Sequence, residues 1–85
     1  MTPFMPHTFV HKILHDESAK LRKYHCYSVW YYDENRKEII ICTTRPGLWI
    51  GRNGANTEKI QSDVNKILNE HNIDEIKISY IECQS

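Results

Sequence analysis

The chain has 85 residues, 40% of them apolar and 26% charged, a composition within the range of a single globular domain. A domain of this size buries only about 60 to 65% of the surface that its unfolded chain exposes, which argues against a deep enclosed pocket. No apolar run approaches the roughly 20 residues of a membrane span, and the first residues lack the basic start and apolar block of a signal peptide. We therefore expect a cytoplasmic protein with no membrane partner.

The formal net charge is zero, but the charges are divided unevenly along the chain. Residues 1–59 carry nine Lys and Arg against six Asp and Glu, whereas residues 60–85 carry two against five. This division predicts a modest basic face. Binding to a nucleic acid should then be weaker and less dependent on salt than binding by a strongly basic domain.

The first predicted elements are a helix and two strands. After a proline-containing lead over residues 1–7, Thr8 can cap a helix that runs to about Lys23. Two runs rich in β-branched and aromatic residues, 26–32 and 38–44, predict strands joined by a turn over 33–37. The apolar face of the helix is expected to consist of Phe9, Val10, Ile13, Leu14 and Leu21.

Two further helices and a strand follow. Pro46 ends the second strand, and a short helical turn over 48–51 precedes a long helix from Asn56 to about Asn69. Alternating apolar residues over 75–81 predict a last strand. The sequence thus predicts a single α+β domain, with the order helix, strand, strand, short helix, long helix, strand, and a three-stranded sheet covered on one face by helices.

Two of the three glycines, Gly51 and Gly54, frame Arg52 and Asn53 where the short helix turns into the long one. Glycine tolerates the positive φ of such a bend, and its missing Cβ lets a sugar-phosphate strand approach the backbone. The first N–H groups of the long helix, its dipole and the Arg52 charge would then face the phosphates. The alternative is a plain turn between helices, because G-x-x-G alone is a weak signal.

The segment TRPGLWIGRNGANTEKIQSDVNKI, residues 44–67, resembles the type II K-homology (KH) domain, together with the order of elements around it. The shared features are R-P-G after a β-rich run, an apolar triplet ending in Ile50, the G-x-x-G itself, and E-K-I one turn into the next helix. A looser resemblance covers nearly all of residues 1–85, with 45–82 as the minimal motif. Within the family the chain is most similar to the KH domain of the bacterial small-subunit ribosomal protein that carries one. That protein continues into a second domain that this sequence lacks, so we do not expect the chain to be that protein.

The resemblance implies that the GXXG loop clamps the backbone of about four nucleotides of a single strand, with the bases in a narrow apolar groove between the long helix and the sheet edge. We expect the strand to be RNA, with single-stranded DNA as the alternative. Carried over to this sequence, the phosphates would be held by Gly51, Arg52, Asn53 and Gly54. Ile50 and Ile60 would line the groove, and Arg45 and Lys59 would add charge at its flanks.

Two residues depart from the family pattern. Asn53 stands where many members carry a lysine or arginine, which predicts reduced affinity. Trp49 is bulkier than the usual aliphatic residue, and we interpret it as a core anchor, with stacking on a base as the alternative. A single neutral KH unit should bind weakly, so we expect a second contact through a partner protein, a dimer or the ribosome.

Other constellations predict little further chemistry. His7, His11 and His15 recur every four residues, but no matching acidic or cysteine ligand completes a set, so we expect no metal and no cofactor. Cys26, Cys42 and Cys83 form no C-x-x-C pair and are expected to be buried free thiols. No carboxylate pair, Ser-His-Asp set or phosphate loop of a nucleotide hydrolase is present, so we do not expect an enzyme.

The sequence supports two functions. The first is a single-stranded nucleic-acid-binding module in translation, ribosome association or RNA handling. The second is a protein-interaction module on a KH scaffold. It would use either the acidic C-terminal half or the aromatic residues in and next to the first strand, one face of which we expect to pack under the helices while the other stays available to a partner. These aromatic residues are Tyr24, Tyr27, Trp30, Tyr31 and Tyr32.

Overall fold

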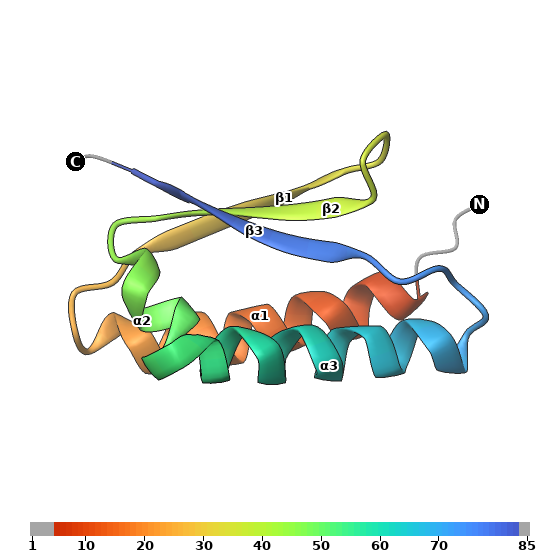
Figure 1. The fold of residues 1–85 in the computed structure, drawn as a ribbon, viewed down its shortest axis with the longest axis horizontal. Coiled ribbons are helices and arrows are strands. Elements are labelled where there is room, and N and C mark those ends of the chain that lie inside the picture. Colours follow the sequence, from red (N-terminus) through yellow and green to blue (C-terminus); the bar gives the residue numbers. More distant parts are fainter. Residues whose placement is uncertain (1–4, 84–85) are drawn as a thin grey trace.

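The computed structural model describes residues 5–83, and the side chains from Thr8 to Cys83. Three strands form one sheet, and the helices lie along one side of it (Figure 1). None of the described helices is long and apolar enough to cross a membrane. The elements in chain order are α1 (Met5–Arg22), β1 (Ser28–Asp33), β2 (Glu38–Thr43), α2 (Pro46–Ile50), a turn of 3-10 helix (Arg52–Gly54), α3 (Ala55–Glu70) and β3 (Lys77–Glu82).

The sheet has the order β1-β2-β3. β1 and β2 form an antiparallel hairpin, in which Trp30 lies opposite Ile41, whereas β3 runs parallel to β2. Parallel neighbours need a crossover connection, and the segment of α2 and α3 supplies it. The predicted α+β class, element order and three-stranded sheet are confirmed.

The start of α1 differs from the prediction. The helix already includes Met5, so Thr8 lies inside it and does not cap it, and the predicted lead over residues 1–7 overlaps the helix. Pro6 falls in the first turn, where a missing N–H removes no intrahelical hydrogen bond, so the proline begins the helix instead of delaying it. The rest of the predicted lead, residues 1–4, lies outside the described residues.

The buried face of α1 also differs in one member. Val10, Leu14 and Leu21 are buried as predicted, but Phe9 is 46% exposed. Phe9 is turned toward the far end of α3, where its ring stacks on His71 with centroids 6.4 Å apart.

The first strand begins two residues later than predicted, because a turn follows α1. The N–H groups of Tyr24 and His25 donate to carbonyls of the last helical turn, and His25 takes a positive φ of 62°. Cys26 therefore precedes β1. Its thiol is buried, but Cys42 and Cys83 are only half-buried, so the prediction of three buried thiols is wrong for two of them.

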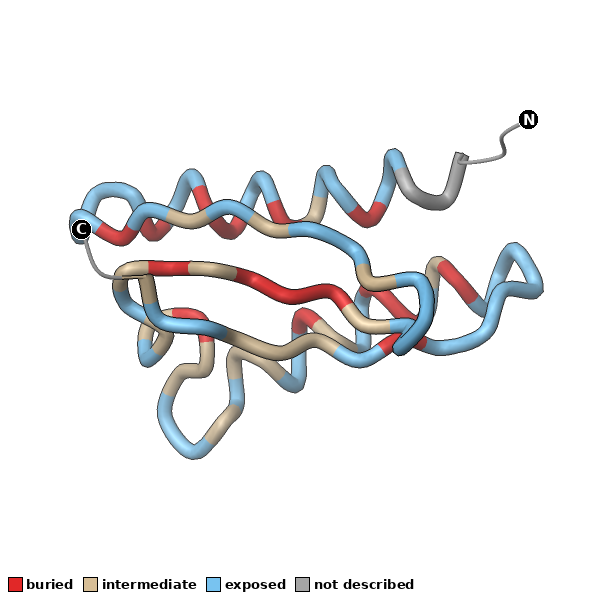
Figure 2. Tube along the Cα trace, turned by 90° about the horizontal axis from the view of Figure 1, so that it is seen from above, coloured by how far each residue is buried: buried red, intermediate tan, exposed pale blue. Residues whose placement is uncertain are grey.

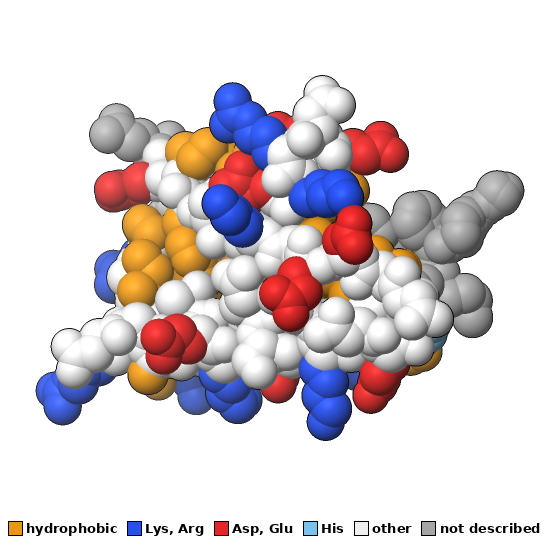
Figure 3. Space-filling model, turned by 45° about the vertical axis from the view of Figure 1, so that its right-hand side comes forward, with side chains coloured by type: hydrophobic (Ala, Val, Ile, Leu, Met, Phe, Trp, Pro, Cys, Tyr) orange, Lys and Arg blue, Asp and Glu red, His pale blue; other side chains and the backbone are white. Residues whose placement is uncertain are grey.

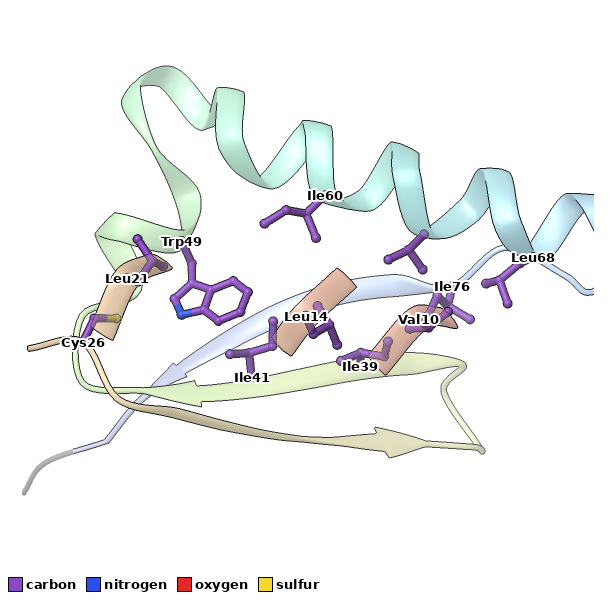
Figure 4. Packing of buried hydrophobic residues seen from close by; sticks show 11 residues of the cluster. Val10, Leu14, Leu21, Cys26, Ile39, Ile41, Trp49, Ile60, Leu68 and Ile76 are labelled. Atoms are coloured by element: carbon purple, nitrogen blue, oxygen red, sulfur yellow. The ribbon is translucent and has the colours of Figure 1, made fainter. Parts of the chain in front are cut away.

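Trp49 is the largest fully buried side chain, with no exposed surface (Figure 4). Its indole N–H donates to Ser28 Oγ at 2.8 Å, and Ser28 Oγ donates to Thr43 Oγ1 at 2.9 Å. The polar edge of the indole is thus satisfied while its rings fill the space between α2 and the sheet. Trp49 is therefore a core anchor, as interpreted from the sequence. The alternative, that it stacks on a base, is wrong because no face of the ring is exposed.

Replacement of Trp49 by alanine should lower the free energy of unfolding by about 3 to 5 kcal/mol, since it empties the largest site in the core. Urea denaturation followed by circular dichroism measures this loss. The matched control is Ile81→Ala, at a position 49% exposed on β3, which should cost less than about 1 kcal/mol. Equal losses in the two variants would contradict the anchor role.

Candidate nucleic-acid interface

The GXXG loop consists of Gly51, Arg52, Asn53 and Gly54. The Gly51 N–H donates to the Gly47 carbonyl at 2.9 Å and closes α2. Positive φ angles follow at Gly51 (78°), Asn53 (56°) and Gly54 (76°). Asparagine tolerates the left-handed region better than most side chains, so Asn53 suits the loop conformation where a longer basic residue would be strained.

The two glycines are required for different reasons. Gly51 combines φ 78° with ψ 176°, a region that is essentially restricted to glycine, and a Cβ added there would lie 2.7 Å from the Cβ of Asn56. Gly54 is left-handed with φ 76° and ψ 11°, and a Cβ there would meet nothing within 4 Å. Gly51 therefore packs against the protein, and Gly54 leaves open space above the backbone.

Asn56 holds this loop to the rest of the domain. Its Nδ2 donates to Glu17 Oε2 of α1 at 2.9 Å and to the carbonyl of Trp49 at 2.8 Å. Glu17, nearly buried, also pairs with Lys20 at 3.2 Å. One side-chain amide thus connects α1, the end of α2 and the start of α3, and the Gly51 backbone packs against its Cβ.

The start of α3 forms the electropositive part of the site. No side chain caps this 16-residue helix at Gly54, so its first N–H groups are not engaged by a capping side chain. The helix dipole adds partial positive charge at the same end, beside the exposed Arg52 and Asn53. Glu58, the one acidic residue of the first turn, opposes this field.

The charges elsewhere form no comparable patch on the face that Figure 3 shows. This view turns the right-hand side of Figure 1, opposite the GXXG loop, toward the viewer. Acidic and basic side chains are interspersed over it, with apolar groups between them. A phosphate backbone gains no general attraction from this end of the molecule.

The structure brings some of the predicted site residues together and separates others. Ile50 is half-buried next to the loop, but Arg45 precedes α2, about 7 Å of helix away from Gly51. Lys59 lies on the side of α3 that faces α1, where it lines a groove of about 340 Å³. Ile60 is only 4% exposed and belongs to the core (Figure 4), so its assignment to an open groove wall is corrected.

The boundary between α3 and β3, predicted to be apolar, contains polar side chains at every fourth position of the helix. Thr57 Oγ1 and the Tyr80 hydroxyl are hydrogen-bonded at 2.7 Å, and Gln61 Nε2 donates to the Ile76 carbonyl at 2.8 Å. Asn65 Oδ1 accepts from the Ile76 N–H at 3.0 Å. We call Thr57, Gln61, Asn65 and Tyr80 the polar seam. It fixes α3 against β3, and Thr57 is the member closest in sequence to the GXXG loop.

The Tyr80 phenol is perturbed by this position. Burial raises its pKa above the ordinary tyrosine value, the hydrogen bond with Thr57 lowers it in part, and the negative charge of Glu17 raises it further. Tyr80 is therefore a neutral hydroxyl at neutral pH, able to donate or accept a hydrogen bond.

The predicted histidine row is engaged with a tryptophan. His11 Nδ1 accepts a hydrogen bond from the Trp30 indole at 2.9 Å, and the His15 ring meets Trp30 edge-on at 5.1 Å. The side chain of His7 lies outside the described residues. Among the described residues, no three His, Cys, Asp or Glu side chains are grouped in a way that could hold a metal ion.

Residues 8–85 match the family model of the KH domain, so the chain belongs to the KH domain family, in its type II form. Domains of this family generally bind single-stranded nucleic acid and are typically non-catalytic. No curated protein and no solved structure matches the chain significantly.

The sequence reasoning missed Glu17, Asn56 and the polar seam. One signal was present: Glu17 follows Leu14 by three residues and so falls within the apolar stripe of α1, where an acid needs a buried partner. Nothing in the sequence identifies Asn56 as that partner, because 39 positions separate the two residues.

Alanine at the two loop glycines should have unequal effects on stability. Gly54→Ala should cost about 1 to 2 kcal/mol, the strain of an L-residue in the left-handed region. Gly51→Ala should cost about 3 kcal/mol or more, because the conformation is less accessible and the new methyl group meets Asn56. Urea denaturation of both variants compares them directly, and an equal or reversed order would contradict the packing described.

Tyr80 should make stability depend on alkaline pH. Because burial raises the folded-state pKa, the folded chain holds this proton more tightly than the unfolded chain does. The resulting stability is complete below the ordinary tyrosine pKa, about 10, and is lost as pH rises through the folded-state value. Tyr80→Phe should flatten the fall of the unfolding free energy above about pH 10. Tyr27→Phe, at an exposed site, should not; identical slopes in all three chains would refute the assignment.

Proposed function

We propose that the chain binds single-stranded RNA through the GXXG loop and that the polar seam contributes to recognition of the bases. The observation that carries this proposal is the loop geometry. Gly54 leaves open space above a backbone that leads into the uncapped start of α3, and the exposed side chains of Arg52 and Asn53 directly precede it.

Phosphates would be held mainly by the backbone. The first N–H groups of α3 supply donors with fixed directions, Arg52 supplies the one full charge of the loop, and Asn53 supplies a neutral amide. Because few side-chain charges take part, binding should be weak and only modestly dependent on salt. Glu58 lowers the affinity further by placing a negative charge in the same helical turn.

The bases would lie beside the loop, along the boundary between α3 and β3. Ile50 offers half-buried apolar surface for a flat base, while Thr57, Gln61 and Tyr80 carry polar groups suited to base edges. Ile60 supports this boundary from the core, and Arg45 and Lys59 contribute charge from a distance.

We place the function in translation, ribosome association or RNA handling. This rests on the resemblance of the GXXG segment to the KH domain of the bacterial small-subunit ribosomal protein. Weak binding by one domain becomes useful when a second contact raises the effective concentration, through a partner protein or a large assembly.

A titration of the isotope-labelled chain with random short single-stranded RNA, and with the matching DNA, tests the proposal by NMR. RNA should shift the amides of residues 50–61, and more strongly than DNA. The double variant Arg52→Asp, Asn53→Asp should weaken binding about tenfold or more, because charge-assisted contacts are worth about 1.5 to 3 kcal/mol.

The matched control is Lys66→Asp, Asn69→Asp, which makes the same change of charge at exposed positions near the far end of α3. It should leave affinity almost unchanged. Unshifted loop amides with the fold intact, or equal losses in the two double variants, would refute the clamp.

A further inference from the structure

β1 is an edge strand, and Ser28 and Trp30 present backbone groups on its outer side. The Thr44 N–H donates to the Tyr27 carbonyl at 3.0 Å. This bond shows which residue pairs of the antiparallel ladder are hydrogen-bonded and which are not. Val29 and Tyr31 therefore exchange hydrogen bonds with β2, whereas the N–H and C=O groups of Ser28 and Trp30 point away from the sheet. No hydrogen bond within the described part of the chain engages these four outward groups.

Natural sheets usually protect such an edge with lysine, proline or a covering element. β1 contains neither lysine nor proline, and its outer face exposes Val29 (67%) and Tyr31 (52%). The opposite edge of the sheet differs, because β3 begins with the exposed Lys77. Within the described residues, the edge strand without a lysine or proline is therefore β1.

A hollow of about 290 Å³ lies beside this edge, between α1 and β1. His11 and His15 line it from the helix, and residues 28–30 line it from the strand. The hydrogen bond between Trp30 and His11, with His15 against the same indole, holds these rings in place. A strand added to β1 would direct alternate side chains into the hollow and the others alongside Val29 and Tyr31.

The arrangement of α1 decides between two occupants. Seen from above the sheet, α1 runs alongside β1, overlaps it in part and extends past its outer side (Figure 2), on the face of the sheet that the helices cover (Figure 1). A second copy paired edge to edge about a twofold axis would bring its own α1 into the same space. A single extended segment carries no such helix, and its backbone complements the free groups of Ser28 and Trp30.

We infer that the outer edge of β1 is a docking site for one extended segment of a partner protein, which adds as a fourth strand and places an apolar side chain between His11 and His15. This interaction is strand addition, in which backbone hydrogen bonds supply affinity and side-chain pockets supply selectivity. The site lies at the sheet edge opposite β3, so it is independent of the proposed RNA site.

The test uses capped ten-residue peptides in which apolar residues alternate with threonine, and peptides of the same composition with a central proline as reference. In an NMR titration of the full chain, the alternating peptides should shift the amides of Ser28 and Trp30 and slow their hydrogen exchange. The amides of the GXXG loop should stay unchanged.

Two chains assembled from synthetic segments joined at Cys42 provide the matched comparison. N-methylation of the Trp30 amide removes one outward donor without touching the β1–β2 ladder, and should weaken peptide binding at least tenfold. N-methylation of the Tyr80 amide does the same on the opposite edge. The N–H groups of Lys77 and Cys83 donate to the carbonyls of Lys37 and Thr43, so odd-numbered residues of β3 face β2 and the Tyr80 N–H points outward. Its loss should change peptide binding less than twofold.

Three outcomes would overturn the inference. In the first, no alternating peptide slows hydrogen exchange at Ser28 and Trp30. In the second, the two N-methylated chains lose peptide affinity equally, and in the third, the chain self-associates and the Trp30 methyl group abolishes this. The last would make a second copy the occupant.

Discussion

The side-chain amide of Asn56 donates two hydrogen bonds, and the shape of the GXXG loop depends on them. One bond goes to the carboxylate of Glu17, a nearly buried acid, and the other goes to the backbone carbonyl of Trp49. Because the Gly51 backbone packs against the Cβ of the same residue, the first glycine has little freedom to move. The loop is therefore held from beneath by polar contacts, while its outer surface at Gly54 stays open. A preformed loop binds with a smaller loss of conformational entropy than one that must order itself around its ligand.

A neutral domain can offer a site for anions because the donors are backbone groups. The N–H groups at the start of α3 contribute nothing to formal charge, yet they point in one direction and the helix dipole reinforces them. The charges on the face seen in Figure 3 are interspersed, so this face offers nucleic acid no bulk attraction. In the proposed function, discrimination among bases would depend on hydrogen-bonding groups at short range, such as those of the polar seam.

Local patterns predicted the elements well because helix and strand periodicities are local properties. The long helix was predicted over 56–69 and spans Ala55–Glu70, and the glycines of the turn were identified from their spacing. Periodicity indicates that a residue such as Ile60 is buried, but it does not indicate which neighbour buries it. For that reason the groove wall was assigned to Ile60, although Thr57 and Gln61 are the residues that meet β3. The pairings of Glu17 with Asn56 and of Trp30 with His11 join distant parts of the chain, and only the folded structure reveals them.

The parallel pairing of β2 with β3 has a consequence for folding. The β1–β2 hairpin closes over a few residues, but β3 joins β2 only after the whole segment from Thr44 to Ile76 has been folded back, which makes this the slow contact of the domain. The GXXG loop lies in the middle of that segment, and its conformation depends on α1, α2 and α3 together. A partly folded chain that contains the hairpin alone lacks the contacts that shape the GXXG loop. Any ligand of the loop therefore binds only the complete fold, and it stabilises the whole domain by mass action.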